Sequence, residues 1–302
     1  MLTQKKITIP IKKTRLIVTK LSPNNATKQE LTWTTSNDSI VKITNIKKYL
    51  NDGMEVATLK ALAPGEAIIK ASAKEFGTWG GFSIFDTTKV TVPNPLIYIS
   101  PEFRDKGPGA LNYGMEQDRM EPLAEELHNY LQSKGYNSII GCETSGKDKI
   151  HAYERTDESN AFGADFHIAL HSNSFDGTAS GPFTIYSRVG TYAHPNSNTL
   201  PNKFKTITSN QSEMSKNLSQ KIQDNLFNLY CQTEEFNDAV KRAVNNEPHY
   251  QFTEVTAVDA VASYVEVAFH DNPLDAKWII DNMGEIAKAI GEAIIDYILE
   301  TT

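Results

Sequence analysis

The chain has 302 residues, of which 39% are hydrophobic and 22% charged, and its formal net charge is −7. This length suits two domains, and the composition is that of a globular protein with enough apolar side chains for real cores. The negative charge argues against non-specific binding to nucleic acid or to an anionic membrane. No run of eighteen apolar residues occurs, so no membrane span is predicted.

The first residues, MLTQKKITIPIKK, are basic, but no apolar segment follows them. We therefore predict no signal peptide in this chain. An extracellular protein would then be a mature fragment or would leave the cell by another route, such as lysis. Cys142 and Cys231 have no metal-binding or redox spacing, which predicts two free thiols rather than a disulfide framework.

Residues 1–93 contain short segments rich in Val, Ile and Thr, separated by Pro, Asn and Gly; among them are RLIVTKLSP, ELTWTTSND and FDTTKVTVP. Short alternating segments of this kind are typical of an all-β sandwich. Pro93 and Pro95 interrupt the last segment, because neither can donate a hydrogen bond to a strand ladder. We therefore expect a linker here, between a domain of residues 1–93 and a domain of residues 96–302.

The N-terminal portion resembles a bacterial immunoglobulin-like module of the group 2 type. The resemblance depends on LSPNNATKQELTWTTSNDSIVKI, LKALAPGEAIIKASA and TKVTV, with the Trp33 strand and the Ala-Pro-Gly turn in the expected order. It implies an immunoglobulin-like β-sandwich that acts as a spacer or an adhesive unit rather than as a catalytic domain.

From residue 96 onward, predicted strands alternate with predicted helices. The pattern predicts strands at LIYIS, NSIIGC, FHIALH and ASYVEVAF, and helices at YGMEQDRMEPLAEELHNYLQSKG, ERTDESNAFG, 211–232, 234–245 and most of LDAKWIIDNMGEIAKAIGEAIIDYILE. The polar segment 190–210 is expected to be a loop. This alternation predicts an α/β domain with a mainly parallel sheet covered by helices on both faces. In such sheets the site lies beyond the carboxyl ends of the strands.

Three polar residues occupy positions where apolar side chains are expected. Glu116 lies one turn before Met120 and continues the apolar stripe of its helix, His171 ends the strand HIALH, and Glu266 lies within YVEVAF. A buried carboxylate is costly unless it is paired or bound to a metal. Desolvation raises the pKa of a carboxyl group inside an apolar strand, which suits a general base. The simpler alternatives are a helix cap for Glu116 and an ion pair with a basic neighbour for Glu266.

The segment ADFHIALHSNS places His167 and His171 four residues apart. Four residues of a strand span roughly 13 Å, whereas zinc ligand atoms lie about 2 Å from the metal, so the two histidines cannot share one zinc ion. We take His171 as the ligand candidate and His167 as a core or supporting histidine. Arg155 is expected to pair with a helix carboxylate, and Asn160 to shape its loop.

In this order the segments resemble the zinc-dependent N-acetylmuramoyl-L-alanine amidases of the type 3 class, which cleave peptidoglycan. The resemblance depends on IYISP, YGMEQDRM, ERTDESNAFGADFHIALHSNS and YVEVAFHDNPLDAKWI, and it covers about residues 96–300. It implies that Glu116 and His171 are zinc ligands and that Glu266 is the catalytic glutamate.

The family's first zinc ligand is a histidine that closes the first strand, whereas Phe103 occupies that place in this chain. A catalytic zinc normally takes three protein ligands and keeps one position for water. The third ligand therefore stays open among Glu102, His270, His194 and a water molecule. We favour Glu102, because it is adjacent to the vacated position.

The leading hypothesis is a zinc-dependent peptidoglycan hydrolase that cleaves the amide between N-acetylmuramic acid and L-alanine. Zinc would polarise the carbonyl and acidify a water molecule, while Glu266 exchanges the proton. Such an enzyme would work in the bacterial cell wall or outside the cell, as an autolysin or a phage-type endolysin. The alternative is a wall-binding or adhesive protein whose amidase-like domain is inactive. The sequence does not define the peptidoglycan type, the host or the oligomeric state.

Overall fold

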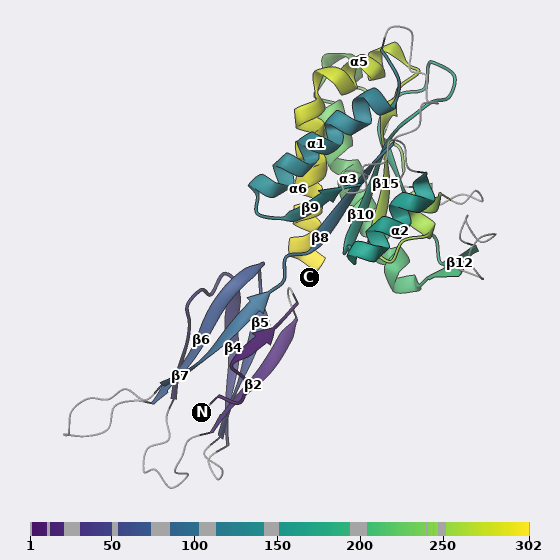
Figure 1. Cartoon of the computed structure of the whole chain (residues 1–302). Helices are drawn as coiled ribbons and strands as arrows, with labels where there is room; N and C mark the ends of the chain where they lie inside the picture. Colours follow the sequence, from purple (N-terminus) through teal and green to yellow (C-terminus); the bar gives the residue numbers. More distant parts are fainter. Residues whose placement is uncertain are drawn as a thin grey trace. The chain divides into compact units, whose positions relative to one another are not determined.

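The computed structural model describes residues 2–10, 13–20, 31–49, 54–73, 85–102, 113–141, 151–193, 204–239, 241–243, 245–246 and 252–301. The chain forms two compact units (Figure 1), one of residues 1–94 with 298–302 and the other of residues 95–297. Cys231 is a free thiol, and Cys142 lies outside the described residues. None of the described helices is long and apolar enough to cross a membrane.

The first unit contains two β-sheets (Figure 1). The four-stranded sheet has the order β1 (Lys6–Thr8), β7 (Phe85–Val92), β6 (Gly65–Ala73) and β3 (Leu31–Thr35). The three-stranded sheet has the order β2 (Thr14–Lys20), β5 (Met54–Ala61) and β4 (Val41–Tyr49). Burial alternates strictly along β5, as expected for a strand with one face toward a core. The predicted β-rich N-terminal portion is confirmed, and the immunoglobulin-like assignment stays a prediction.

The second unit contains a six-stranded sheet, in which the central strands β8, β10 and β15 are parallel. The order is β14 (Asn245–Asn246), β11 (Phe183–Tyr186), β15 (Val261–Phe269), β10 (Phe166–Asn173), β8 (Leu96–Pro101) and β9 (Asn137–Ile140). β11 runs antiparallel to β15, so the sheet is mixed. Seven consecutive residues of β10 are buried, as expected for a strand covered on both faces.

Helices cover both faces of this sheet. On one face, Tyr297 of α6 (Met283–Thr301) packs edge-on against Phe166 of β10, and α3 (Ser209–Tyr230) hydrogen-bonds to β15 through Ser219 and Ser263. The apolar stripe of α1 (Gln117–Ser133) is buried as predicted, and Gly135 follows with φ +82°. On the opposite face, where Tyr98 stacks on His167, lie α2 (Ala152–Phe162) and α4 (Thr253–Thr256). α5 (Pro273–Asp281) follows β15.

Two predicted segments differ from the structure. The expected loop 190–210 contains the paired strands β12 (Gly190–Ala193) and β13 (Phe204–Ile207). The expected helix 234–245 is wrong: it is limited to a 3₁₀ turn at Glu234–Phe236, and Asn245–Asn246 pairs with β11 as a strand. Phe236 turns back and stacks on Tyr230 at a ring distance of 4.1 Å, which takes the chain out of the helical path.

The packing of α6 against α1 gives a testable prediction. A Cβ atom at Gly291 would lie 2.8 Å from Cε1 of Tyr130, whereas one at Gly284, in the same helix, would meet nothing within 4 Å. We expect Gly291→Ala to lower the free energy of unfolding by about 1–3 kcal/mol through overpacking. The matched control Gly284→Ala should keep or raise it, by up to about 1 kcal/mol, because alanine favours helix. Urea unfolding measures both, and equal effects would contradict the packing described.

Candidate metal centre and active site

The site lies at the carboxyl end of β10. His171 there is in register with Glu266 of the parallel strand β15. Residues in register on neighbouring strands direct their side chains to the same face of a sheet, so both face the side that carries α2 and α4. The adjacent strand β8 ends at Pro101, and the next residue, Glu102, donates its backbone N–H to the Leu170 carbonyl at 3.0 Å. Three parallel strands thus deliver acidic and imidazole side chains to one edge.

Three carboxylates surround the His171 imidazole. Nδ1 lies 3.3 Å from Oε1 of Glu116 and 3.4 Å from Oε2 of Glu102, and Nε2 lies 2.9 Å from Oε2 of Glu254. The ring stacks on Tyr264 with a centroid distance of 4.1 Å and an interplanar angle of 11°. The imidazole is therefore fixed both in its plane and at its two nitrogens.

Glu116 does not cap its helix. It directly precedes α1, but its side chain accepts no capping hydrogen bond. Oε1 instead accepts the backbone N–H of Ser172 at 2.8 Å, and the side chain is buried. Burial would raise the pKa of Glu116, but the contacts with His171 and the Ser172 N–H outweigh it and lower this pKa. The capping alternative is wrong, and the carboxylate is aimed at the end of β10.

Glu254, which the sequence reading missed, forms the other side of the site. Arg155 donates to it from Nη2 at 2.9 Å and from Nε at 3.2 Å, and the Ser100 hydroxyl also donates to it. All three side chains are buried. Burial raises the pKa of Glu254, but Arg155 and the two nearby histidines overcome this effect and hold it well below the ordinary value. The predicted pairing of Arg155 with a helix carboxylate is confirmed.

Among the described residues, Glu266 is the one carboxyl group of this cluster with a fully buried oxygen that lacks a hydrogen-bond partner. That oxygen, Oε2, is buried. Burial, aided by the negative charges of Glu116 and Glu102 and opposed by His171, raises the pKa of Glu266 to about 8. A carboxyl group with a free oxygen and this pKa can take up and return a proton near neutral pH.

The charge balance of the cluster fits a divalent cation. Arg155 pairs with Glu254 at 2.9 Å and lies 3.7 Å from Glu102, and Glu116 adds a third carboxylate. In the ion-free chain the raised pKa of Glu266 keeps this group protonated at neutral pH, whereas a bound cation would lower the pKa and let the carboxylate accept a proton. Burial would lower the pKa of His171, but Glu116 and Glu254 raise it to about 10, so an imidazolium balances the carboxylates in the ion-free chain. A metal ion would replace that proton, because a histidine must be neutral to bind a metal.

Glu102, His171 and Glu254 offer ligand atoms that all lie within 4.8 Å of one another, and they are the metal-capable group found among the described residues. Glu254 belongs to this group because of the distances between the ligand atoms. Arg155 is closer to Glu254, at 2.9 Å, than to Glu102, at 3.7 Å, and Glu102 and Glu116 both face Nδ1 of His171. The donor set on the Nδ1 side, one nitrogen and two carboxylates, suits zinc.

The other histidines considered as ligands have different positions. His167 is fully buried, stacks on Tyr98 and lies 3.8 Å from Glu254, so its predicted supporting position is confirmed. His270 faces the Ser172 hydroxyl, 3.0 Å from Nδ1, and is not part of the metal-capable group. Phe103 and His194 lie outside the described residues.

Asn160 shapes its surroundings, as predicted. Its side-chain amide donates to the Ala257 carbonyl at 2.9 Å, and its oxygen accepts the Asp259 N–H at 2.7 Å. These two bonds tie α2 to the chain between α4 and β15.

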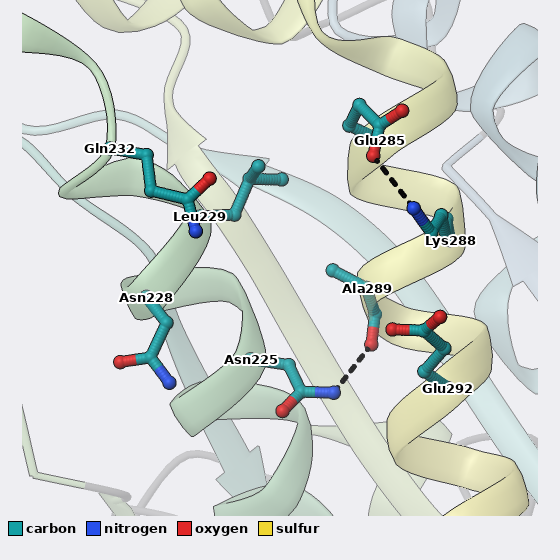
Figure 2. Close-up of a pocket in the computed structure, with 8 residues that line it drawn as sticks. All are labelled: Asn225, Asn228, Leu229, Gln232, Glu285, Lys288, Ala289 and Glu292. Carbon is teal, nitrogen blue, oxygen red and sulfur yellow. Dashed lines mark hydrogen bonds and ion pairs between the residues drawn. The ribbon is translucent and has the colours of Figure 1, made fainter.

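A cavity of about 270 Å³ lies elsewhere in this unit, between α3 and α6 (Figure 2). Polar groups in its lining already have partners: Asn225 donates to the Ala289 carbonyl at 3.1 Å, and Lys288 pairs with Glu285 at 3.3 Å. None of the residues of the acidic cluster lines this cavity, and its composition indicates no chemistry.

The fold and the cluster together define an α/β domain with a histidine-carboxylate centre at the ends of its parallel strands. The sequence profile described as N-acetylmuramoyl-L-alanine amidase matches residues 97–296, which is more than half of the chain. The chain therefore belongs to the N-acetylmuramoyl-L-alanine amidase family, and the predicted resemblance to these amidases is confirmed.

Solved amidase structures share the fold. An N-acetylmuramoyl-L-alanine amidase from Clostridium difficile 630 is similar with a TM-score of 0.54 and 19% identity, over 69% of this chain and 99% of that one. The apo form of an amidase from Mycobacterium abscessus has a TM-score of 0.52 and 12% identity, over 67% of this chain and 98% of that one. An amidase from Mycobacterium smegmatis has a TM-score of 0.51 and 15% identity, over 68% of this chain and 96% of that one. Among curated proteins, none matches the chain.

Proposed function

We propose that this protein hydrolyses the amide between N-acetylmuramic acid and L-alanine in peptidoglycan, with zinc as cofactor and Glu266 as the base. Family membership supports the substrate class and a place of action in the cell wall or outside the cell. The observation that carries the mechanism is the buried, unpartnered Oε2 of Glu266 in register with His171. Whether the protein is an autolysin or a phage-type lysin depends on its source, not on this geometry.

The proposed zinc ligands are His171, Glu116 and Glu102. Glu102 takes the role left open by Phe103, because its carboxylate lies 3.4 Å from the same imidazole nitrogen that faces Glu116. When bound, zinc supplies a Lewis acid for the scissile carbonyl and lowers the pKa of a bound water.

The chain's own residues then divide the work. Glu266 accepts the water proton and returns it to the leaving amine, as a general base and then a general acid. Glu254, held by Arg155 and Ser100, accepts from Nε2 of His171 and leaves Nδ1 for the ligand role. Carboxylate partners of this kind orient metal-binding histidines and raise their basicity. Tyr264 keeps the ring in its plane.

One sequence feature favours a second candidate, an inactive wall-binding protein: Phe103 replaces the family's first ligand. The two candidates are separated by incubating the purified protein with cell walls in the presence of zinc and analysing the products. Release of peptides with a new N-terminal L-alanine supports the hydrolase. Unchanged muropeptides, together with protein that holds no zinc, support the binding protein.

The proposed ligand set predicts a ranking of zinc affinities. Removing a partner outside the coordination sphere costs about 10–100-fold in metal affinity, so Glu254→Gln should fall in that range. Glu102→Ala and Glu116→Ala each remove a ligand and should cost at least about 100-fold. The exposed Glu126 of α1 provides the control, since Glu126→Gln should leave zinc affinity unchanged. Competition with a zinc chelator measures all four variants. If Glu254→Gln costs more than Glu102→Ala, Glu254 is the ligand and our assignment is wrong.

A further inference from the structure

Acidic and basic residues are distributed unequally between the two units of the chain. Residues 1–94 with 298–302 hold 14 Lys and Arg against 8 Asp and Glu, whereas residues 95–297 hold 16 against 29. The amidase unit is therefore strongly acidic, and the β-rich unit is basic. A charge division of this size indicates separate partners for the two units.

Four lysines of the first unit lie on the outer face of the sheet β2–β5–β4. Along β5, Glu55, Ala57, Leu59 and Ala61 point inward and are buried, so the residues between them point outward. The register then places these outward residues in rows with their partners in β2 and β4. We call the outward residues of these three strands the lysine face; its lysines are Lys20, Lys42, Lys47 and Lys60.

This arrangement of lysines does not stabilise the sheet. Lys42 and Lys60 lie directly opposite each other on neighbouring strands, and like charges in this position destabilise a sheet. Among the described residues of the three strands the lysine face has no carboxylate, because Glu55 is turned inward toward Trp33. On the other sheet of the same unit, Lys89 pairs with Glu66 at 2.7 Å, whereas Lys42 and Lys60 face each other.

Apolar side chains lie between the lysines. Leu16 is 61% exposed and Tyr49 is 40% exposed. The Nζ atom of Lys47 lies 5.1 Å from the centre of the Tyr49 ring. Lys42 and Lys60 lie in one row, and Lys47 and Lys20 lie in rows four and six residues away along β5, roughly 13–20 Å from it. Apolar side chains lie among these charges. Such a surface fits a short stretch of a chain in which anionic groups alternate with carbon-rich segments.

We infer that the lysine face binds a polyol-phosphate polymer attached to bacterial peptidoglycan. The inference rests on the proposed function, which places the protein in the cell wall. Phosphodiester groups would pair with the lysines, and the polyol segments would contact Leu16 and Tyr49. Nucleic acid is disfavoured because the described lysine face has only one exposed aromatic ring available for base stacking. Binding here would hold the enzyme near its substrate by local concentration.

The test uses the full-length Glu266→Gln protein, so that the walls stay intact during the assay. Cosedimentation with purified walls is measured before and after hydrofluoric acid removes their phosphodiester polymer. Lys42→Glu/Lys60→Glu is compared with Lys6→Glu/Lys70→Glu, which makes the same charge change on the outer face of the other sheet. Circular dichroism confirms that both variants are folded.

We expect stripped walls to lose binding, and we expect the lysine-face variant to bind complete walls at least about tenfold more weakly than its control at 0.1 M salt. The affinity should also fall with increasing salt, with a smaller slope in the lysine-face variant. Equal binding to stripped walls, or an equal loss in both variants, overturns the inference. So does a DNA strand with the same number of phosphates that displaces the protein better than the free polymer does.

The outcome is separable from the proposed function. Hydrolysis of small soluble muropeptides by an otherwise native Lys42→Glu/Lys60→Glu protein should be unchanged, because those substrates carry no polymer. If the Lys42→Glu/Lys60→Glu protein keeps both hydrolysis and wall binding, only the proposed role of the lysine face is wrong. If the native protein hydrolyses no muropeptide but its wall binding depends on the polymer, only the proposed amidase mechanism is wrong.

Discussion

Glu266→Gln should reduce turnover of peptidoglycan fragments by about 10²–10⁴-fold or more, while the protein keeps its fold and its zinc. Glutamine has the shape of the protonated carboxyl group but cannot accept a proton from water. The variant should fold well, because the pKa of Glu266 is already raised to about 8 by its burial and the native side chain is neutral below that pH in the ion-free chain. Release of free N-terminal alanine measures turnover, and zinc per chain is determined in parallel.

The same substitution has a pH signature in the metal-free protein. A carboxyl group whose pKa is raised by folding holds a proton that the unfolded chain has lost, so the native protein loses stability as pH rises from the ordinary carboxyl pKa toward about 8. Glu266→Gln lacks this loss and should gain relative to the native chain over that range. The control Glu126→Gln alters an exposed residue and should match the native enzyme in rate and in pH dependence. Turnover that persists in Glu266→Gln would show that another group is the base.

Much of the second unit follows from local patterns. The apolar stripe of α1 and the continuous apolar run of β10 predict a helix and a buried strand, and both are present. The errors arise where tertiary contacts decide. β12 and β13 pair with each other, and each has only four residues, too few for a clear pattern. The helix predicted at 234–245 is lost because Phe236 packs back on Tyr230, which no local pattern reveals.

The site shows the same division between local and tertiary information. Glu116, His171 and Glu266 could be selected because each is a polar residue in an apolar pattern, and the structure brings Glu116 and Glu266 to His171. Glu254 could not, because it lies in α4, a helix of four residues with no period to interrupt. Its pairing with Arg155 spans 99 positions of the chain. A buried arginine that needs a counter-charge was the signal that could have led to it.

Arg155→Met should lower the free energy of unfolding by about 3–5 kcal/mol, because it leaves Glu254 as a buried carboxylate without its cation. Arg155 is fully buried and Glu254 is 2% exposed, so water cannot replace the lost hydrogen bonds. Without Arg155, Glu254 would favour the protonated form of His171, whose Nε2 already lies 2.9 Å away, and an imidazolium cannot bind a metal. Both stability and zinc affinity should therefore fall, as measured by urea unfolding and by chelator competition.

The double variant Arg155→Met/Glu254→Met separates charge from packing. Replacing both members of a buried ion pair with apolar side chains of similar volume is often neutral or stabilising, so this variant should recover most of the stability lost in Arg155→Met. Zinc affinity should stay reduced in it, because Nε2 of His171 then has no carboxylate partner and the orientation of the ring is lost. A double variant as unstable as the single one would mean that the Arg155 side chain acts through its packing against β8, and the charge argument for Glu254 would fail.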